Sequence, residues 1–167
     1  MNKKVGKMTL SMALAAALAF APAQAFAAPA TDISGNWAEK VITQWQEKGL
    51  ISGYEDGTFK PDNSVTRAEL VIMLNKALGF TQKGNVTFSD VSANAWYYDA
   101  VAIAVEAGYC AGYEDGTFKP NATITRAEAA VMIAKAKELT ANTEAADKFA
   151  DASRIPAWAK GSIGAVS

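Results

Sequence analysis

The chain has 167 residues, of which 16 are basic, 17 are acidic and none is histidine, for a formal net charge of −1. This balance argues against a nucleic-acid-binding protein, which would need a strongly basic face. A single cysteine, Cys110, excludes an internal disulfide. In an internal repeat described below, the position equivalent to Cys110 is Ile51, so we expect Cys110 to be a buried apolar residue.

Residues 1–27 have the pattern of a secretory signal peptide. Three lysines among the first seven residues precede an apolar stretch, residues 8–21, that is too short to span a bilayer. Two small-x-small cleavage sites follow, ending at Ala25 and Ala27. Cleavage after Ala27 would leave 140 residues with 13 basic and 17 acidic side chains, a net charge of −4. We therefore predict an exported protein that keeps no membrane segment after cleavage.

A first helix is expected soon after residue 31. Asn36 has the chemistry of an N-cap, with Glu39 three residues on, and Gly49 follows as a C-terminal glycine. Apolar residues fall on one face at helical spacing and are expected to pack in a core: Trp37, Val41, Ile42 and Trp45.

The next stretch occurs twice. Residues 53–69 read GYEDGTFKPDNSVTRAE, and residues 112–128 match them at 13 of 17 positions, 59 residues later. Such identity shows that the chain is built from an internal repeat. An Asp-Gly pair in each copy, at Asp56 and Asp115, predicts a tight turn because glycine accepts a positive φ.

Each copy ends in Thr-Arg-Ala-Glu, the pattern of a capping box. The threonine accepts a hydrogen bond from a backbone N–H in the first turn, and the glutamate reaches back to the N–H of the threonine. We therefore predict helices at residues 67–78 and about 126–139. Four residues are assigned this structural, helix-capping role: Thr66, Glu69, Thr125 and Glu128.

Arg67 and Arg126 open these two helices, although a cation there faces the positive end of the helix dipole. Two interpretations remain open. Each arginine is either solvated or paired with a nearby carboxylate, or it forms an anion site with the free N–H groups of the first turn.

The second copy repeats the plan of the first, with Trp96 in the place of Trp37, and both tryptophans are assigned a structural role in the core. A third copy starts at Phe149 and places Trp158 at the same position, but no second motif follows it. We interpret it as a truncated repeat. The expected segments are a signal peptide (1–27), repeat 1 (28–87), repeat 2 (88–148) and a partial repeat 3 (149–167).

These copies resemble S-layer homology domains, whose signature is a GYxDGTFxP loop followed by [VI]TRAE at a helix start. The resemblance covers the mature chain as two complete repeats and the start of a third. It implies an all-α fold of tandem helix–loop–helix repeats, packed as a pseudo-threefold helical prism with ligand grooves between neighbouring repeats. Glu55 and Glu114 depart from the family, which often has proline there.

The resemblance further implies noncovalent anchoring of an exported protein at the cell wall or S-layer. The expected partner is an anionic, pyruvylated secondary cell-wall polysaccharide attached to peptidoglycan, and no cofactor is needed. By this resemblance Arg67 and Arg126 bind the acidic sugar, since arginine holds a carboxylate through two parallel hydrogen bonds. Loop residues are expected to complete the ligand-binding set: Gly53, Tyr54, Asp56, Gly112, Tyr113 and Asp115. The two tyrosines offer flat apolar faces for sugar rings, and such a role is the alternative to core packing for Trp37 and Trp96.

The sequence argues against two of three other functions. A glycosidase needs a single pair of flanking acids, whereas every acidic candidate here is duplicated with its repeat, so no catalytic residue is assigned. A calcium loop needs oxygen ligands at alternating positions, which Lys60 and Pro61 interrupt, so no metal ligand is assigned. The remaining alternative is a protein–protein interaction or S-layer assembly module that another chain completes.

The signal-peptide pattern makes a direct prediction about the exported protein. We expect its N-terminus at Ala28, or at Phe26 if the earlier small-x-small site is used. N-terminal sequencing of the secreted protein checks this, and secreted protein that still begins at Met1 would contradict it.

Overall fold

The computed structural model describes residues 31–167, so the predicted signal peptide lies outside the described part. Its helices are α1 (Glu39–Glu47), α2 (Arg67–Leu78), α3 (Tyr98–Glu106), α4 (Arg126–Ala136), α5 (Thr143–Ala146) and α6 (Ala157–Ala165), with a 3-10 turn at Ala152–Arg154. Residues 31–167 contain no strand beyond one isolated antiparallel bridge between Thr66 and Thr123. The predicted all-α fold is confirmed. None of the described helices is long and apolar enough to cross a bilayer.

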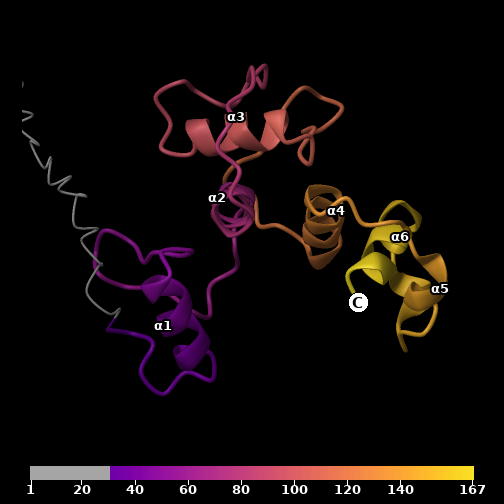
Figure 1. The fold of residues 1–167 in the computed structure, drawn as a ribbon, viewed down its shortest axis with the longest axis horizontal. Helices are drawn as coiled ribbons and strands as arrows, with labels where there is room; N and C mark the ends of the chain where they lie inside the picture. Colours follow the sequence, from indigo (N-terminus) through magenta and orange to yellow (C-terminus); the bar gives the residue numbers. More distant parts are fainter. Residues whose placement is uncertain (1–30) are drawn as a thin grey trace, which may run out of the picture.

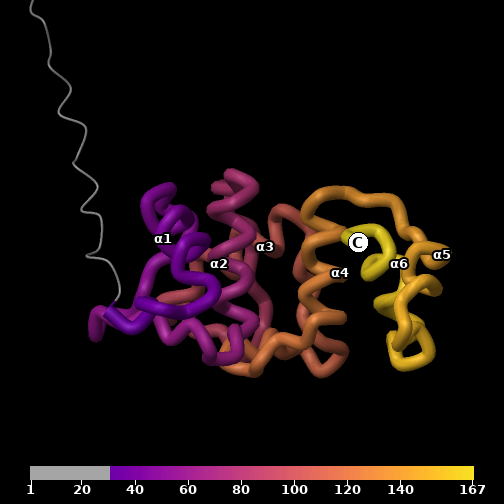
Figure 2. Tube along the Cα trace, turned by 90° about the horizontal axis from the view of Figure 1, so that it is seen from below, coloured from indigo at the N-terminus to yellow at the C-terminus, as the bar shows by residue number. Residues whose placement is uncertain are grey.

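The helices are arranged around three corners. In Figure 1, α1, α3 and the α5–α6 pair lie at the corners, and α2 and α4 lie between them. The second helix of each repeat packs on the first helix of the next repeat, α2 on α3 and α4 on α6. Figure 2 shows that the units follow one another in chain order along the long axis. Each repeat therefore completes its packing with the repeat that follows it.

Both central helices begin at the predicted capping boxes. Thr66 Oγ1 accepts from Glu69 N (3.3 Å) while Glu69 Oε2 accepts from Thr66 N (2.7 Å). Thr125 and Glu128 make the same two bonds, at 3.2 and 3.0 Å. These bonds satisfy donors that a helix N-terminus otherwise leaves unpaired, so the sequence determines where both helices start.

Two other helix ends differ from the predictions. α1 begins at Glu39 because the Asn36 side chain accepts from Ala38 N (2.9 Å), which forms a turn before the helix starts. α4 ends at Ala136 instead of Leu139 because Glu138 takes a φ of 52° and Leu139 N bonds back to Ala134 O (2.8 Å). A residue with positive φ stops the helical backbone and closes its C-terminus.

The main core lies where repeat 1 meets repeat 2. Val71, Val101, Tyr109 and Phe118 are its largest fully buried side chains. Cys110 is buried beside them, as predicted, and this burial raises the pKa of its thiol. The core is therefore shared between repeats and does not belong to either one alone.

One buried polar network crosses this core. The Tyr109 hydroxyl donates to Asn75 Oδ1 (2.7 Å), and Asn75 Nδ2 donates to the Ala100 carbonyl (2.9 Å). Asn75 is 5% exposed and Tyr109 is 1% exposed, so neither group can exchange these bonds for water. Because the network joins α2, α3 and the segment after α3, it sets how the two repeats align.

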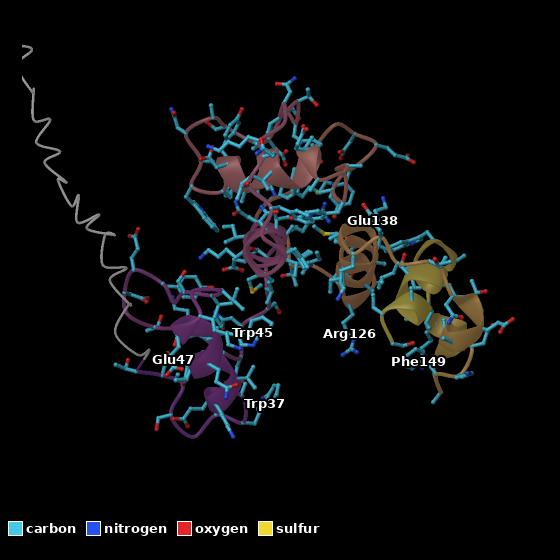
Figure 3. The ribbon with its side chains drawn as sticks, in the orientation of Figure 1. Trp37, Trp45, Glu47, Arg126, Glu138 and Phe149 are labelled. Carbon is cyan, nitrogen blue, oxygen red and sulfur yellow. The ribbon has the colours of Figure 1, made fainter. Side chains whose placement is uncertain are left out.

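The core role predicted for the tryptophans is wrong. Trp37 is 91% exposed and Trp96 is 67% exposed, and Val41 and Trp45 are also exposed. Trp37 and Trp45 are labelled in Figure 3. Only Ile42 of the predicted apolar face is buried, against Ile33 and the partly buried Phe59 of the following loop. α1 packs on its own loop through Ile42, and this directs the face that carries Val41 and Trp45 outward.

The buried network predicts a specific loss of stability. Tyr109→Phe should lower the free energy of unfolding by about 1–3 kcal/mol, because it leaves the buried Asn75 Oδ1 without a donor. Tyr54→Phe is the matched control, since it removes a similar bond, to Glu69 (2.8 Å), at an exposed site. Urea denaturation of both variants measures the difference, and equal losses would contradict a special role for the buried network.

Candidate functional site

The repeated motif folds into a turn that its own aspartate organises. Asp56 Oδ1 accepts from Thr58 N (3.0 Å) and from the Thr58 hydroxyl, while Tyr54 N donates to Thr58 O (2.7 Å). The Thr58 bonds, with help from Lys60, lower the pKa of Asp56 to about 2. Gly57 adopts the positive φ (80°) that the turn requires. Asp115 and Thr117 repeat these bonds in the second loop.

A second aspartate clamps each loop from outside the motif. Asp32 accepts from Phe59 N and Lys60 N, both at 2.8 Å, and these bonds lower the pKa of Asp32. Asp90 accepts from Phe118 N and Lys119 N at the same distances. This clamp was not predicted from the sequence, although an Asp-[Ile/Val]-Ser pattern recurs at the start of both repeats.

Arg67 lies buried at the junction of the two repeats. Its Nε donates to the Phe118 carbonyl (2.8 Å), and its Nη1 lies 3.4 Å from Glu128 Oε1. The guanidinium carbon lies 4.6 Å from the centre of the Tyr113 ring and 5.1 Å from that of Phe118, within the range of cation–π contacts. Of the two interpretations left open by the sequence, this geometry matches an arginine paired with a carboxylate.

The backbone at the start of α2 is also engaged. Arg67 N donates to Ala122 O and Ala68 N donates to Pro120 O, both at 3.0 Å. These N–H groups are therefore not free for an anion. Burial opposes ionisation of Glu128, but the bonds from Tyr113 (2.7 Å) and Thr125 outweigh it, so its pKa is lowered and the pair with Arg67 stays charged at neutral pH.

Arg126 has a different environment. It is exposed at the start of α4 and extends away from that helix end in Figure 3. Within residues 31–167 it forms no ion pair, whereas its counterpart Arg67 does. The same motif position therefore holds a buried arginine in repeat 1, which connects that repeat to repeat 2, and an exposed cation in repeat 2.

An open groove of about 750 Å³ lies beside the first motif loop. Three of the predicted ligand-binding residues, Gly53, Tyr54 and Asp56, line it together with Glu69. Apolar side chains also line it: Ile51, Phe59, Val65, Ile72 and Met73. Among the lining residues from outside the motif are Lys76 on α2 and Trp96, which comes from the second repeat.

The other predicted ligand-binding residues lie elsewhere. Gly112, Tyr113 and Asp115 form the second loop, where Arg67 covers the Tyr113 ring. Neither Arg67 nor Arg126 lines the groove. The structure thus brings Arg67 to Tyr113 of the next repeat, and not to Tyr54 of its own.

One ion pair and several hydrogen bonds engage charged side chains of the first loop. Lys60 Nζ lies 3.0 Å from Asp56 Oδ2 and 4.4 Å from the centre of the Tyr54 ring. The Tyr54 hydroxyl donates to Glu69 Oε1 (2.8 Å), which raises the pKa of Tyr54. Burial opposes ionisation of Glu69, but hydrogen bonds from Thr66 and Tyr54 outweigh it and lower its pKa. Residues 31–167 hold no cluster of acidic or cysteine side chains suited to a metal ion.

The structure is a tandem-repeat module of helix–loop–helix units. An arginine at the start of one central helix contacts the loop of the next unit and so joins the two units. The family model for the S-layer homology domain matches residues 31–71 and 87–130. The chain belongs to this family, as its motifs predicted.

Curated relatives agree with this assignment. The chain is 40% identical over 128 residues to "Surface-layer 125 kDa protein" of Lysinibacillus sphaericus, which covers 77% of this chain and 11% of the relative. It is 34% identical over 142 residues to "Surface layer protein" of Brevibacillus choshinensis, covering 80% and 12%. It is 38% identical over 108 residues to "Cellulosome-anchoring protein" of Acetivibrio thermocellus, covering 61% and 23%.

The alignment spans only about a tenth of the length of the first two relatives. These relatives are surface proteins by name, which confirms the predicted cell-surface location.

The contrast between the two arginines predicts different effects on stability. Arg67→Ala should lower the free energy of unfolding by about 3 kcal/mol, because it leaves Glu128 without its cation at a largely buried junction. Arg126→Ala is the matched control and should change stability by no more than about 0.5 kcal/mol, since that side chain is exposed. Thermal and urea unfolding followed by circular dichroism test this, and equal effects would refute the assignment of Arg67 as a connector.

Proposed function

We propose that this chain anchors an exported protein noncovalently to the bacterial cell wall by binding an anionic, pyruvylated secondary cell-wall polysaccharide. The observation that carries the proposal is the groove beside the first motif loop, where Gly53, Tyr54 and Asp56 lie together. Family membership and the relative named "Cellulosome-anchoring protein" support it. In this proposal the chain binds and does not catalyse.

The groove has the chemistry that a saccharide requires. Tyr54 is 43% exposed and offers an aromatic ring beside backbone and side-chain polar groups. Sugar rings present C–H faces that pack on aromatic rings, and hydroxyls that bond to such polar groups. A volume of about 750 Å³ accommodates a ligand of a few sugar rings.

Arg126 does not line this groove, and we propose it as a separate contact for an acidic group of the polymer. Its guanidinium is exposed, so it can form two parallel bonds to a carboxylate without giving up an existing ion pair. Arg67 is assigned an indirect role, because its bonds to Phe118 and Glu128 hold the second loop in place.

Co-sedimentation with purified wall sacculi tests the proposal. The mature protein should pellet with sacculi that retain their secondary polymer, and should stay in solution after the polymer has been extracted. Equal binding to both preparations would indicate peptidoglycan itself as the partner, and absence of binding to either would refute wall anchoring.

The same assay tests the arginine. Arg126→Ala should weaken binding about 10-fold or more, since a charged hydrogen bond is worth about 1.5–3 kcal/mol. Arg126→Lys keeps the charge and should retain part of the affinity, because lysine cannot form the two parallel bonds. Unchanged binding by Arg126→Ala would remove this residue from the proposed site.

A further inference from the structure

We infer that Trp96 and Lys76, both outside the repeated motif, hold the saccharide in the groove. Trp96 supplies the face on which a sugar ring stacks, and Lys76 pairs with an acidic group of the same ligand. This inference rests on the proposed function and names two residues that determine which ligand the groove accepts.

The exposure of Trp96 has no explanation in the packing of the fold. Trp37, Trp96 and Trp158 occupy the same position in three successive repeats and are 91%, 67% and 62% exposed. A large apolar side chain that stays in water adds none of the stability that its burial would give, and this holds for all three tryptophans. Among these three, Trp96 lines the groove, where it reaches the loop of repeat 1 from repeat 2.

Trp96 is also oriented by a neighbour. Its ring lies edge-to-face with that of Tyr97, with centroids 5.3 Å apart and planes at 78°. Tyr97 is itself buried, so it provides a fixed support. An indole that is held in place and largely exposed can stack on a sugar ring at a low entropic cost. The side chain loses little rotational freedom when the ligand binds.

Lys76 is the available cation of the groove. Lys60, the other lysine in the lining, is held by Asp56 and the Tyr54 ring. Lys76 is exposed in the last turn of α2 and forms no ion pair within residues 31–167. An acidic ligand group can therefore approach it without displacing an internal partner.

Three acids line the groove, namely Glu55, Asp56 and Glu69, and Asp56 is paired with Lys60. Glu69 is in the first turn of α2, seven residues before Lys76, which corresponds to about 10 Å along the helix. Its carboxylate is already engaged by Thr66 and Tyr54. Glu55 also lines the groove, in the loop before α2. This separation favours a ligand whose acidic group lies at the Lys76 end.

The second repeat offers matched controls. Lys135 occupies the position equivalent to Lys76, and Trp158 the position equivalent to Trp96, and both are exposed. Over the second loop, however, Arg67 occupies the space beside Tyr113 and Phe118. The two control residues are therefore the equivalents of Lys76 and Trp96 for a loop that Arg67 already covers, whereas the first loop lines the open groove.

The experiment compares these two pairs in the sacculus assay. Trp96→Ala and Lys76→Ala should each weaken binding about 10-fold or more, while Trp158→Ala and Lys135→Ala should stay within about 2-fold of the parent. The effect of Lys76→Ala should shrink at high salt, because the lost contact is ionic. Lys76→Arg should restore binding, since the charge is kept.

The outcomes separate this inference from the proposed function. Failure of the parent protein to bind sacculi would overturn the proposed function itself. Binding by the parent together with unchanged binding by Trp96→Ala and Lys76→Ala would overturn only the inference. Equal losses in the control pair would also overturn it, since the effect would not belong to the groove.

A second measurement covers the case in which Trp96→Ala does not fold. In a variant with Trp37, Trp45 and Trp158 replaced by phenylalanine, Trp96 is the only tryptophan. Polysaccharide extracted from the sacculi should shift and quench its fluorescence. A spectrum that stays unchanged at polymer concentrations that saturate binding would refute contact between the ligand and Trp96.

Discussion

The burial of Arg67 between two repeats is the interaction on which the rest of the structure depends. One guanidinium contacts the carbonyl of Phe118, the carboxylate of Glu128 and the ring of Tyr113. A buried cation is tolerated only where its hydrogen bonds and its charge are both satisfied. The packing of α2 therefore depends on a correctly formed second loop, and an aspartate clamps each loop in turn, Asp32 the first and Asp90 the second.

This dependence explains how one motif position comes to have two different environments. In repeat 1 the Thr-Arg-Ala-Glu segment meets a loop of the next repeat, so Arg67 becomes a structural connector. In repeat 2 the same segment meets no such loop within residues 31–167, and Arg126 stays exposed. The chemistry of an arginine here depends on which neighbour it has, and identical sequence does not imply identical function.

Whether a motif loop lines an open groove also depends on which residues of other repeats lie beside it. Tyr54 and Tyr113 have identical local bonds, each to the capping glutamate of its own repeat. Tyr113 is covered by Arg67, whereas Tyr54 lines an open groove that Trp96 borders from the second repeat. The open groove thus arises between repeats, where the loop of one unit, its second helix and the start of the next unit converge.

The sequence alone determined the repeat, the all-α class and the starts of α2 and α4, because turns and capping boxes depend on residues only a few positions apart. The burial of Cys110 also followed from the repeat. Tertiary structure decided which arginine is buried, why Trp37 and Trp96 are exposed, and which residues line the groove. Those outcomes depend on contacts between units about 60 residues apart, such as Arg67 with Glu128, and no local pattern encodes which copy has a neighbour.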